Sequence, residues 1–494
     1  MYISPRLLKM SLNFKEIFSI VSSIFITFTI LPVSLIFVIF PLAIYRKIVI
    51  WLSSWNKELS GPLSLNDCAW AWDDVYNRPL AGIVFVIYLK GTHSFSDLVA
   101  RIEKASGKDP KFTCSLTRWM NVPFWKKCDN FNLHNHIKLN TESDPAILAE
   151  FINSQVTKSF LAGQPLWECI SLPNYTPAEH GTKSAIIIRI HHSIGDGLSM
   201  LSIIRELCDP DPAMDANVAQ VLKSIRKKFE LTTWQKICYF FQLIFVTPSE
   251  TVYYMMKGLN SQKIPPPDSN PQKFGVGVTN TTARFDINLL KNISKKTGFS
   301  VTAVIQAGLA GALRELIVSR GGDLERDVVA SYILPRLNHP GTMANNVFCF
   351  PLQSPINLED RFRRLAWISK QFDHVLHSAL PIGLMASATC FCLLLASFGV
   401  DIGISNGGTY AHSNVNLNLS NPLKMFGHVM ETFDLLPGIM AAGNSLFITT
   451  ISYNGKLIIQ LTTDKAAFTD DIDLQRFLHN FQDELNTMME LKMN

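Results

Sequence analysis

The sequence predicts an α/β (α+β) protein of two lobes with a membrane segment at its N-terminus. Three observations predict this fold class. The chain of 494 residues is longer than one hydrophobic core usually supports. Strand-like and helix-like segments alternate after Gly61. An uncharged run at residues 17–44 is long enough to enter a bilayer.

The composition narrows the class of protein. Apolar residues make up 47% of the chain, charged residues 17%, and the mean hydropathy is +0.16, which is typical of a membrane-bound or lipid-handling protein. The net charge of +5 is small for this length and no long basic block occurs, so we expect no nucleic-acid partner. The nine cysteines show no C-x-x-C and no metal-ligand spacing, which predicts reduced, structural thiols.

The run at residues 17–44 has the features of a retained membrane anchor, to which we assign residues 1–60. It is longer than the apolar core of a signal peptide and continues to Trp51 and Trp55, a residue type common at bilayer interfaces. A straight helix of this length spans roughly 42 Å against a hydrocarbon core of about 30 Å, so it must tilt, kink at Pro32 or Pro41, or fold back. Basic residues flank both ends, which leaves one crossing and a re-entrant hairpin both open.

Two further apolar runs lie inside the rest of the chain. Residues 379–400 are uncharged and rich in small residues. We favour a buried or membrane-resting helix there, because a crossing would split the surrounding fold across the bilayer. Residues 234–256 mix aromatic side chains with Lys236 and Glu250, which predicts an amphipathic, interfacial stretch.

Residues 61–210 form the first predicted lobe. We expect strands at 82–89, 166–172 and 184–190, and helices at 95–105 and 144–160. The run at 184–190 is almost wholly apolar, as expected of a central strand. Apolar residues then recur at helical spacing from 198 to 207. Residues 191–197 are therefore a strand-to-helix loop.

Residues 211–277, between two proline-rich stretches, predict a crossover segment, and residues 278–494 form the second predicted lobe. Asn454-Gly455 separates two apolar runs and predicts a β-hairpin, because this dipeptide accepts the positive φ of a type I′ turn. The other elements expected in this lobe are strands at 283–287, 328–334 and 346–352, and helices at 300–319, 358–377 and from 469 onward.

The loop at 191–197, His-His-Ser-Ile-Gly-Asp-Gly, is the candidate for chemistry. His191 or His192 can serve as a base at neutral pH. Gly195 and Gly197 would permit a tight turn, and Asp196 would fix the loop. From these residues alone, a hydrogen-bonded turn without a catalytic role stays open.

Two other readings of the motif have less support. A metal site is disfavoured because the possible partners His134, His136 and His180 stand at no recognised ligand spacing. Ser193 lacks the G-x-S-x-G context of a serine nucleophile.

The motif resembles the HHxxxDG signature of the chloramphenicol acetyltransferase-like superfamily, and in particular of the wax ester synthase/diacylglycerol acyltransferase family. Other similar segments follow in the family's order, at residues 63–67 before a tryptophan-rich stretch, 164–168, 297–301, 334–336, 345–348 and 419–422. The sequence departs from the family at Thr302-Ala303, where an Asn-Asp pair is common, and at Asn421-Pro422, where a longer run is shortened.

The resemblance implies two chloramphenicol acetyltransferase-like lobes with an active-site tunnel at their interface. It implies that His192 is the general base and that Asp196 is structural, paired with Arg336 or, alternatively, with Arg189. His191, Gly195 and Gly197 would shape the loop. The implied substrate-binding residues are Pro165, Leu166, Trp167, Asn346 and Asn421, the last near the thioester oxygen.

The function implied is a long-chain acyl-CoA-dependent O-acyltransferase that makes wax esters from fatty alcohols and, as a second activity, triacylglycerol from diacylglycerol. Acyl-CoA is a co-substrate, and we expect no cofactor or metal. The alternatives are a catalytically silent lipid-binding member of the fold and a glycerolipid acyltransferase of another class. We expect the protein to be located at the endoplasmic reticulum membrane, with the plasma membrane as the alternative. Its catalytic part should face the cytosol.

Overall fold

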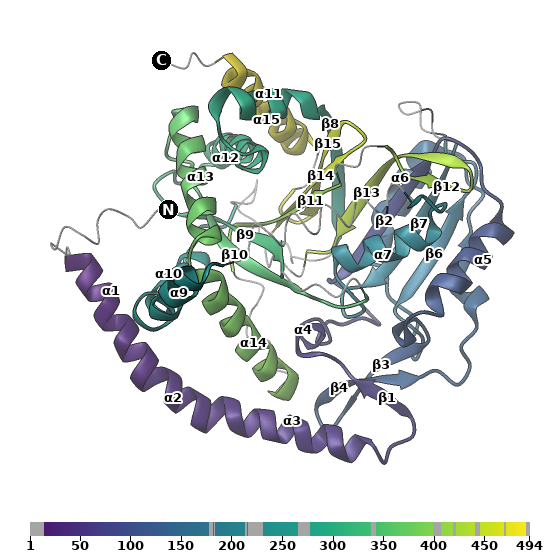
Figure 1. The fold of residues 1–494 in the computed structure, drawn as a ribbon. Helices are drawn as coiled ribbons and strands as arrows, with labels where there is room; N and C mark the ends of the chain where they lie inside the picture. Colours follow the sequence, from purple (N-terminus) through teal and green to yellow (C-terminus); the bar gives the residue numbers. More distant parts are fainter. Residues whose placement is uncertain are drawn as a thin grey trace.

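The computed structural model describes residues 14–176, 181, 183–212, 215, 231–264, 277–336, 342–398, 407–417, 421–439, 445–468 and 471–490. Within these residues each lobe is built on a six-stranded sheet, and a three-stranded sheet lies beside the first lobe (Figure 1). The small sheet has the order β1 (Leu59–Pro62), β4 (Val122–Lys127), β3 (Cys114–Trp119).

The sheet of the first lobe has β2 and β7 at its centre, and every residue of both strands is buried. Both faces are covered, by α5 (Phe95–Ser106) and α7 (Gly197–Leu207) on one side and α6 (Pro145–Gln155) on the other. This explains the nearly continuous apolar runs in these strands. The strand order is β12 (Lys424–Met425), β13 (His428–Pro437), β2 (Gly82–Leu89), β7 (Ser184–His191), β6 (Trp167–Leu172), β5 (Ile137–Leu139).

Strands β12 and β13 correct the predicted domain boundary, because they come from the part of the chain assigned to the second lobe. β13 pairs antiparallel with β2 along its length, and Phe433 and Leu435 lie in the core of the first lobe. Without β13, β2 would be an edge strand with unpaired backbone groups. The range 278–494 is therefore not one lobe.

The second lobe has the strand order β10 (Val347–Ser354), β9 (Val328–Pro335), β11 (Tyr410–Asn416), β14 (Leu446–Tyr453), β15 (Lys456–Asp464), β8 (Val278–Asp286). The hairpin of β14 and β15 is confirmed, with Asn454 and Gly455 at φ 47° and 74°. The main core lies between this sheet and the helices α11 (Ile287–Thr297), α12 (Val301–Ser319), α13 (Arg361–Leu376) and α15 (Ile472–Glu490).

One continuous curved helix of 40 residues, Phe14–Ser53, runs along one side of the molecule (Figure 1). It comprises α1 (Phe14–Phe25), α2 (Leu31–Ser34) and α3 (Phe40–Ser53), joined by π-helical turns just before Pro32 and Pro41. A proline removes a backbone donor, and the helix absorbs each loss by a wider turn. The predicted proline positions therefore mark the curve, and the helix does not fold back as a re-entrant hairpin.

The other apolar runs pack against the body. The run at 234–256 forms α9 (Thr233–Phe245) and α10 (Thr247–Leu259), and α1 lies against both. The run at 379–400 forms α14 (Leu380–Phe398), which contacts α4 (Leu65–Cys68), α10 and α3. That this helix is buried or rests on the membrane and does not cross it stays a prediction. Among the described residues, α12 is also long and apolar enough to cross a membrane, but most of it is buried in the second core.

Candidate active site

The candidate motif begins where β7 ends, and both neighbouring strands fix its backbone. The amide of His191 donates to the carbonyl of Leu166 at 2.9 Å, and the amide of His192 donates to that of Ala81 at 2.8 Å. α7 then starts at Gly197. The predicted strand-to-helix loop is confirmed, and it holds two histidines at the end of a central strand.

His191 is fully buried and bonded within its own lobe. Its Nε2 lies 3.1 Å from Asp73 Oδ2, and its Nδ1 lies 2.8 Å from Ser193 Oγ. The same Asp73 oxygen accepts the amides of Leu80 and Ala81 at 2.8 Å. His191 therefore holds the start of β2 against the motif, which suits the loop-shaping role predicted for it.

His192 is half-buried and contacts a residue from the second half of the chain. Its Nδ1 lies 2.6 Å from Asn345 Oδ1, while Asn345 Nδ2 donates to the His192 carbonyl and to Asp67 Oδ1, both at 2.7 Å. A carbonyl and a carboxylate are both acceptors, so the amide orientation is fixed and its oxygen must face the ring. Nδ1 therefore carries the hydrogen, which leaves the lone pair on Nε2.

A buried carboxylate and a partly buried ammonium group hold Asn345 in place. Asp67 Oδ1 also accepts a hydrogen bond from the backbone amide of Asn345 at 3.0 Å. Its other oxygen, Oδ2, pairs with Lys111 Nζ at 3.0 Å. Lys111 further donates to the carbonyl of Ile194 at 3.0 Å and to that of Met343 at 2.7 Å. One ammonium group therefore joins the motif, the supporting carboxylate and residues 343–346, which precede β10. The sequence analysis did not single out Asn345, Asp67 or Lys111, although the first two lie in segments that carry the family resemblance.

The indole of Trp70 stacks on the His192 ring, with ring centroids 3.8 Å apart and planes 15° apart. Burial lowers the pKa of His192 to about 4, against the opposing effects of Asp196 and Asn345. The imidazole is consequently neutral at pH 7. A neutral ring with a fixed Nδ1 hydrogen is able to accept a proton at Nε2.

Asp196 is the N-cap of α7 and also contacts the second half of the chain. Its Oδ1 accepts the Ser199 amide at 2.8 Å and the Ser199 hydroxyl at 3.0 Å. Its Oδ2 accepts the Asn346 amide at 2.8 Å. These contacts suit a structural role, because they fix both the start of α7 and residues 343–346 before β10.

The predicted arginine partners of Asp196 have different outcomes. The alternative prediction, that Arg189 pairs with Asp196, is wrong. Arg189 Nη1 pairs with Glu168 at 3.1 Å, and its Nε donates to the Gln155 carbonyl. The Arg336 amide donates to the Asn346 carbonyl at 2.8 Å, and in the described part of the chain its Nε has no hydrogen-bond partner. A pair between Asp196 and Arg336 stays a prediction.

The two glycines of the motif differ in what they require. Neither has a positive φ, so the tight turn expected of them is not the reason for glycine. A Cβ at Gly195 would lie 3.0 Å from both Met343 Cε and Ser199 Cβ, whereas at Gly197 it would meet only Leu435, at 3.8 Å. The close neighbours of Gly195 therefore leave no room for a side chain, whereas Gly197 has room for a Cβ.

The predicted substrate-binding residues lie in different surroundings. Pro165, Leu166 and Trp167 are buried in the first lobe behind the motif, and Trp167 Nε1 donates to the Phe112 carbonyl at 2.9 Å. They support the strand end. Asn346 contacts Asp196, and its neighbour Asn345 is the residue that reaches His192. Asn421 is exposed just before β12, and its proposed contact to a thioester stays a prediction.

Fold and site together define an acyltransferase of the two-lobed, chloramphenicol acetyltransferase-like class, as the resemblance implied. Two family models match the chain, the wax ester synthase/diacylglycerol acyltransferase catalytic domain at residues 82–261 and the WS/DGAT C-terminal domain at residues 344–489. The two matches cover more than half of the sequence. The chain belongs to the wax ester synthase/diacylglycerol acyltransferase family.

Individual relatives have low sequence identity to this chain, but the similarity extends over most of its length. "O-acyltransferase WSD" of Acinetobacter baylyi is 20% identical over 402 residues, which cover 74% of this chain and 83% of the relative. "Wax ester synthase/diacylglycerol acyltransferase 5" of Arabidopsis thaliana is 22% identical over 453 residues, covering 78% and 86%. The solved structure of the wax ester synthase/diacylglycerol acyltransferase from Marinobacter aquaeolei VT8 superposes with a TM-score of 0.55 at 16% identity, covering 87% of this chain and all of that one.

Proposed function

We propose that this acyltransferase uses acyl-CoA as donor and esterifies long-chain fatty alcohols, with diacylglycerol as a second acceptor. The observation that carries the proposal is the fixed tautomer of His192, whose Nε2 is left as the free base by the Asn345 contact to Nδ1. The apolar N-terminal helix supports a lipid acceptor, because it brings the enzyme to the place where long-chain alcohols dissolve.

In the proposed reaction, His192 Nε2 accepts the proton of the alcohol O–H as the alcohol oxygen attacks the thioester carbonyl carbon. The imidazolium that forms donates through Nδ1 to Asn345, and the Asp67 carboxylate lies directly behind that amide. When the C–S bond breaks, the sulfur takes the proton from Nε2, which returns neutral His192, free CoA and the ester. No group besides donor and acceptor is needed for this balance.

The remaining roles in the proposal are supporting ones. His191 and Asp196 hold the loop, and Asn421 would approach the thioester oxygen from the second lobe. We place the enzyme on the endoplasmic reticulum membrane with its catalytic part in the cytosol, where acyl-CoA is available. A membrane location is supported by the apolar helix at residues 14–53.

The test is expression of the full chain in a host that lacks neutral lipids, with and without added fatty alcohol. Wild-type protein should produce wax ester when alcohol is supplied and some triacylglycerol without it. His192→Ala should abolish both, whereas the matched control His377→Ala, at an exposed histidine after α13, should not. Full ester synthesis by His192→Ala would refute the assignment of the base. Binding of acyl-CoA by purified wild-type protein without turnover would favour the silent, lipid-binding alternative.

A further inference from the structure

We propose that the helix Phe14–Ser53 lies lengthwise in one leaflet of the membrane, with both of its ends on the same side, and does not cross the bilayer. The proposal rests on how the helix is attached, on where its charges lie and on what its middle exposes. It does not depend on which alcohol the enzyme acylates.

The first end of the helix is tied to the catalytic body by hydroxyl groups. Ser23 is fully buried, and its Oγ lies 2.8 Å from Ser249 Oγ and 3.2 Å from the Val246 carbonyl oxygen. Thr27 Oγ1 donates to the Ile244 carbonyl at 3.0 Å. These contacts fix α1 and the turn after it to the junction of α9 and α10, and α10 in turn lies on β9 and β10 of the second lobe.

The other end is tied to the first lobe. Arg46 is buried, and its Nη2 donates to the carbonyl of Leu63, just before α4. Val49 packs with Val122 and Phe124 of the small sheet. A helix of this length extends about 60 Å, twice the roughly 30 Å of a hydrocarbon core. A crossing would put its ends on opposite sides of the membrane, which one attached body cannot follow.

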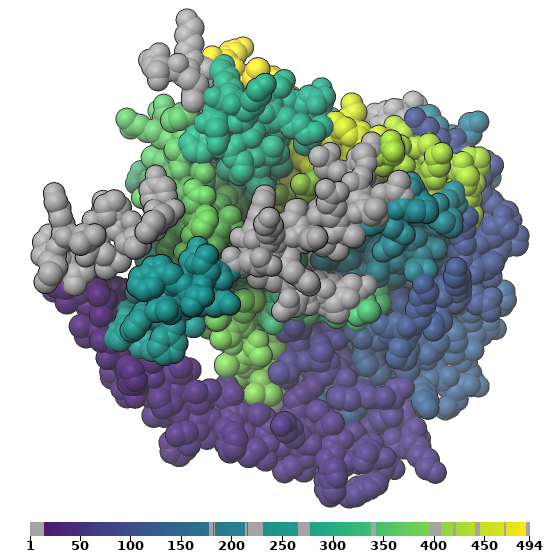
Figure 2. All heavy atoms as spheres, viewed as in Figure 1, coloured from purple at the N-terminus to yellow at the C-terminus, as the bar shows by residue number. Residues whose placement is uncertain are grey.

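In the described part of the chain, the middle of the helix touches α10 and α14 on one side only, and most of its side chains are exposed. The 18-residue stretch of highest hydropathy is only 6% buried, and Phe28 and Phe37 are 64% and 73% exposed. Figure 2 shows an opening bounded by this helix, by α9 and α10, and by α14. Exposed apolar side chains also continue onto α9, at Trp234, Phe240 and Phe241. Such a surface is stable only when hydrocarbon covers it, and lipid chains of one leaflet would fill the opening.

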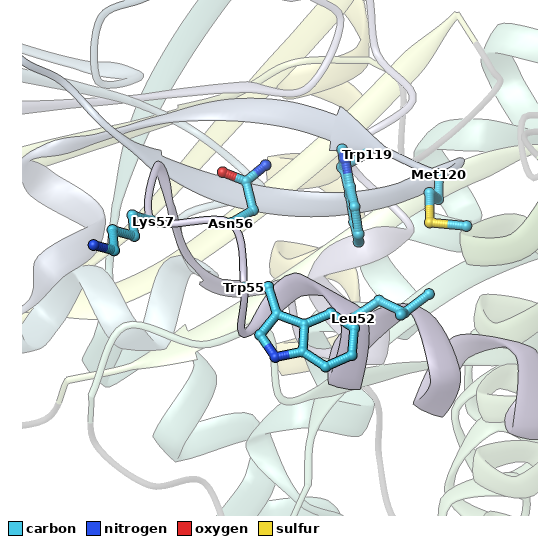
Figure 3. A pocket seen from close by; sticks show the side chains of 6 residues that line it. All are labelled: Leu52, Trp55, Asn56, Lys57, Trp119 and Met120. Atoms are coloured by element: carbon cyan, nitrogen blue, oxygen red, sulfur yellow. The ribbon is translucent and has the colours of Figure 1, made fainter.

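Charged and interfacial residues stand at the two ends and not between them. Lys15 is exposed at the start, Lys47 and Lys57 are exposed at the far end, and residues 17–44 carry no charge. A hollow of about 440 Å³ at the far end is lined by Trp55, Trp119 and Lys57, with Leu52, Asn56 and Met120 (Figure 3). Tryptophan and lysine are the residues that mark the headgroup level, so each end lies at a surface of the bilayer. Because both ends are attached to one body, that surface is the same for both.

The topology is tested on the full chain in sealed microsomes, with one epitope tag at the N-terminus and another at the C-terminus. Both tags should be digested by added protease without detergent. Protection of the N-terminal tag alone would overturn the proposal in favour of a crossing. This result is independent of enzyme activity, so it separates a wrong membrane orientation from a wrong function.

A second measurement tests the embedded face. Phe28→Asp combined with Phe37→Asp should lower flotation with vesicles of phosphatidylcholine and phosphatidylserine at least about fivefold. The matched control is Val318→Asp, an exposed apolar position on α12 of the second lobe, which should float like wild type. Equal flotation of both variants would show that the helix is not what holds the protein to the bilayer, and the proposal would fail.

Discussion

At the scale of single residues, the catalytic proposal depends on hydrogen bonds that the sequence does not announce. Asn345 is 153 positions from His192, and Asp67 is 278 positions from Asn345. Local patterns identify a histidine at a strand end, because the strand and the following helix are periodic. They cannot identify which distant amide faces the ring. For the same reason the sequence suggests Arg189 as a partner of Asp196, whereas the structure pairs Arg189 with Glu168.

Removing the Asn345 side chain should slow the reaction without unfolding the protein. In Asn345→Ala, Nδ1 loses its acceptor, so both tautomers are populated and the imidazolium loses its support. We expect kcat to fall about 10- to 100-fold with KM nearly unchanged. Steady-state kinetics in detergent check this, with exposed Asn288→Ala on α11 as the control. A change in KM alone would assign Asn345 to substrate binding.

The lowered pKa of His192 predicts the pH profile. The neutral ring is the reactive form, and it predominates above its own pKa, which burial lowers to about 4. The acidic limb of kcat/KM should therefore lie well below 6.5, the ordinary value for histidine. Trp70→Ala, which exposes the ring, should move that limb upward toward 6.5. A wild-type limb already at 6.5 would contradict the proposed environment.

At the scale of elements, periodicity predicted most helices and strands but not which sheet each strand joins. The central strands, the β14–β15 hairpin and the curve of the N-terminal helix follow from local sequence. The place of β13 in the first sheet does not, because the sequence analysis predicts no strand at residues 428–437 and nothing local ties that segment to the distant β2. The loop between β7 and α7 shows a similar limit, since its two glycines look alike in sequence and differ only in their neighbours.

Alanine substitutions distinguish the two glycines. Gly195→Ala must displace Met343 or Ser199, and we expect it to lower the unfolding free energy by about 1–3 kcal/mol. Gly197→Ala meets only an ordinary contact at the first position of α7, where alanine is the better helix former, so stability should be unchanged or slightly higher. Thermal unfolding of both variants checks this. Equal losses would mean that the steric account of Gly195 is wrong.

At the scale of the whole molecule, Lys111 joins the two halves of the chain around the site, because its ammonium group contacts Asp67, Ile194 and Met343. Lys111→Met leaves the Asp67 carboxylate buried without its cation and frees two carbonyls. We expect a loss of about 3–5 kcal/mol of stability together with lower activity. Denaturant unfolding checks this, with Lys104→Met at an exposed position of α5 as control. A stable but inactive variant would place Lys111 in the chemistry instead.

The position of β13 also fixes the order in which the protein can be completed. During synthesis β2 is made long before the strand that covers its edge, because β13 is complete only when residue 437 has been added. Until then the nascent first lobe exposes an open sheet edge, which is a template for aggregation. The first lobe therefore cannot finish folding before most of the second lobe has been synthesised. A chain truncated before β13 is left with an unfinished first lobe, even though every residue of its His-His-x-x-x-Asp-Gly loop is present.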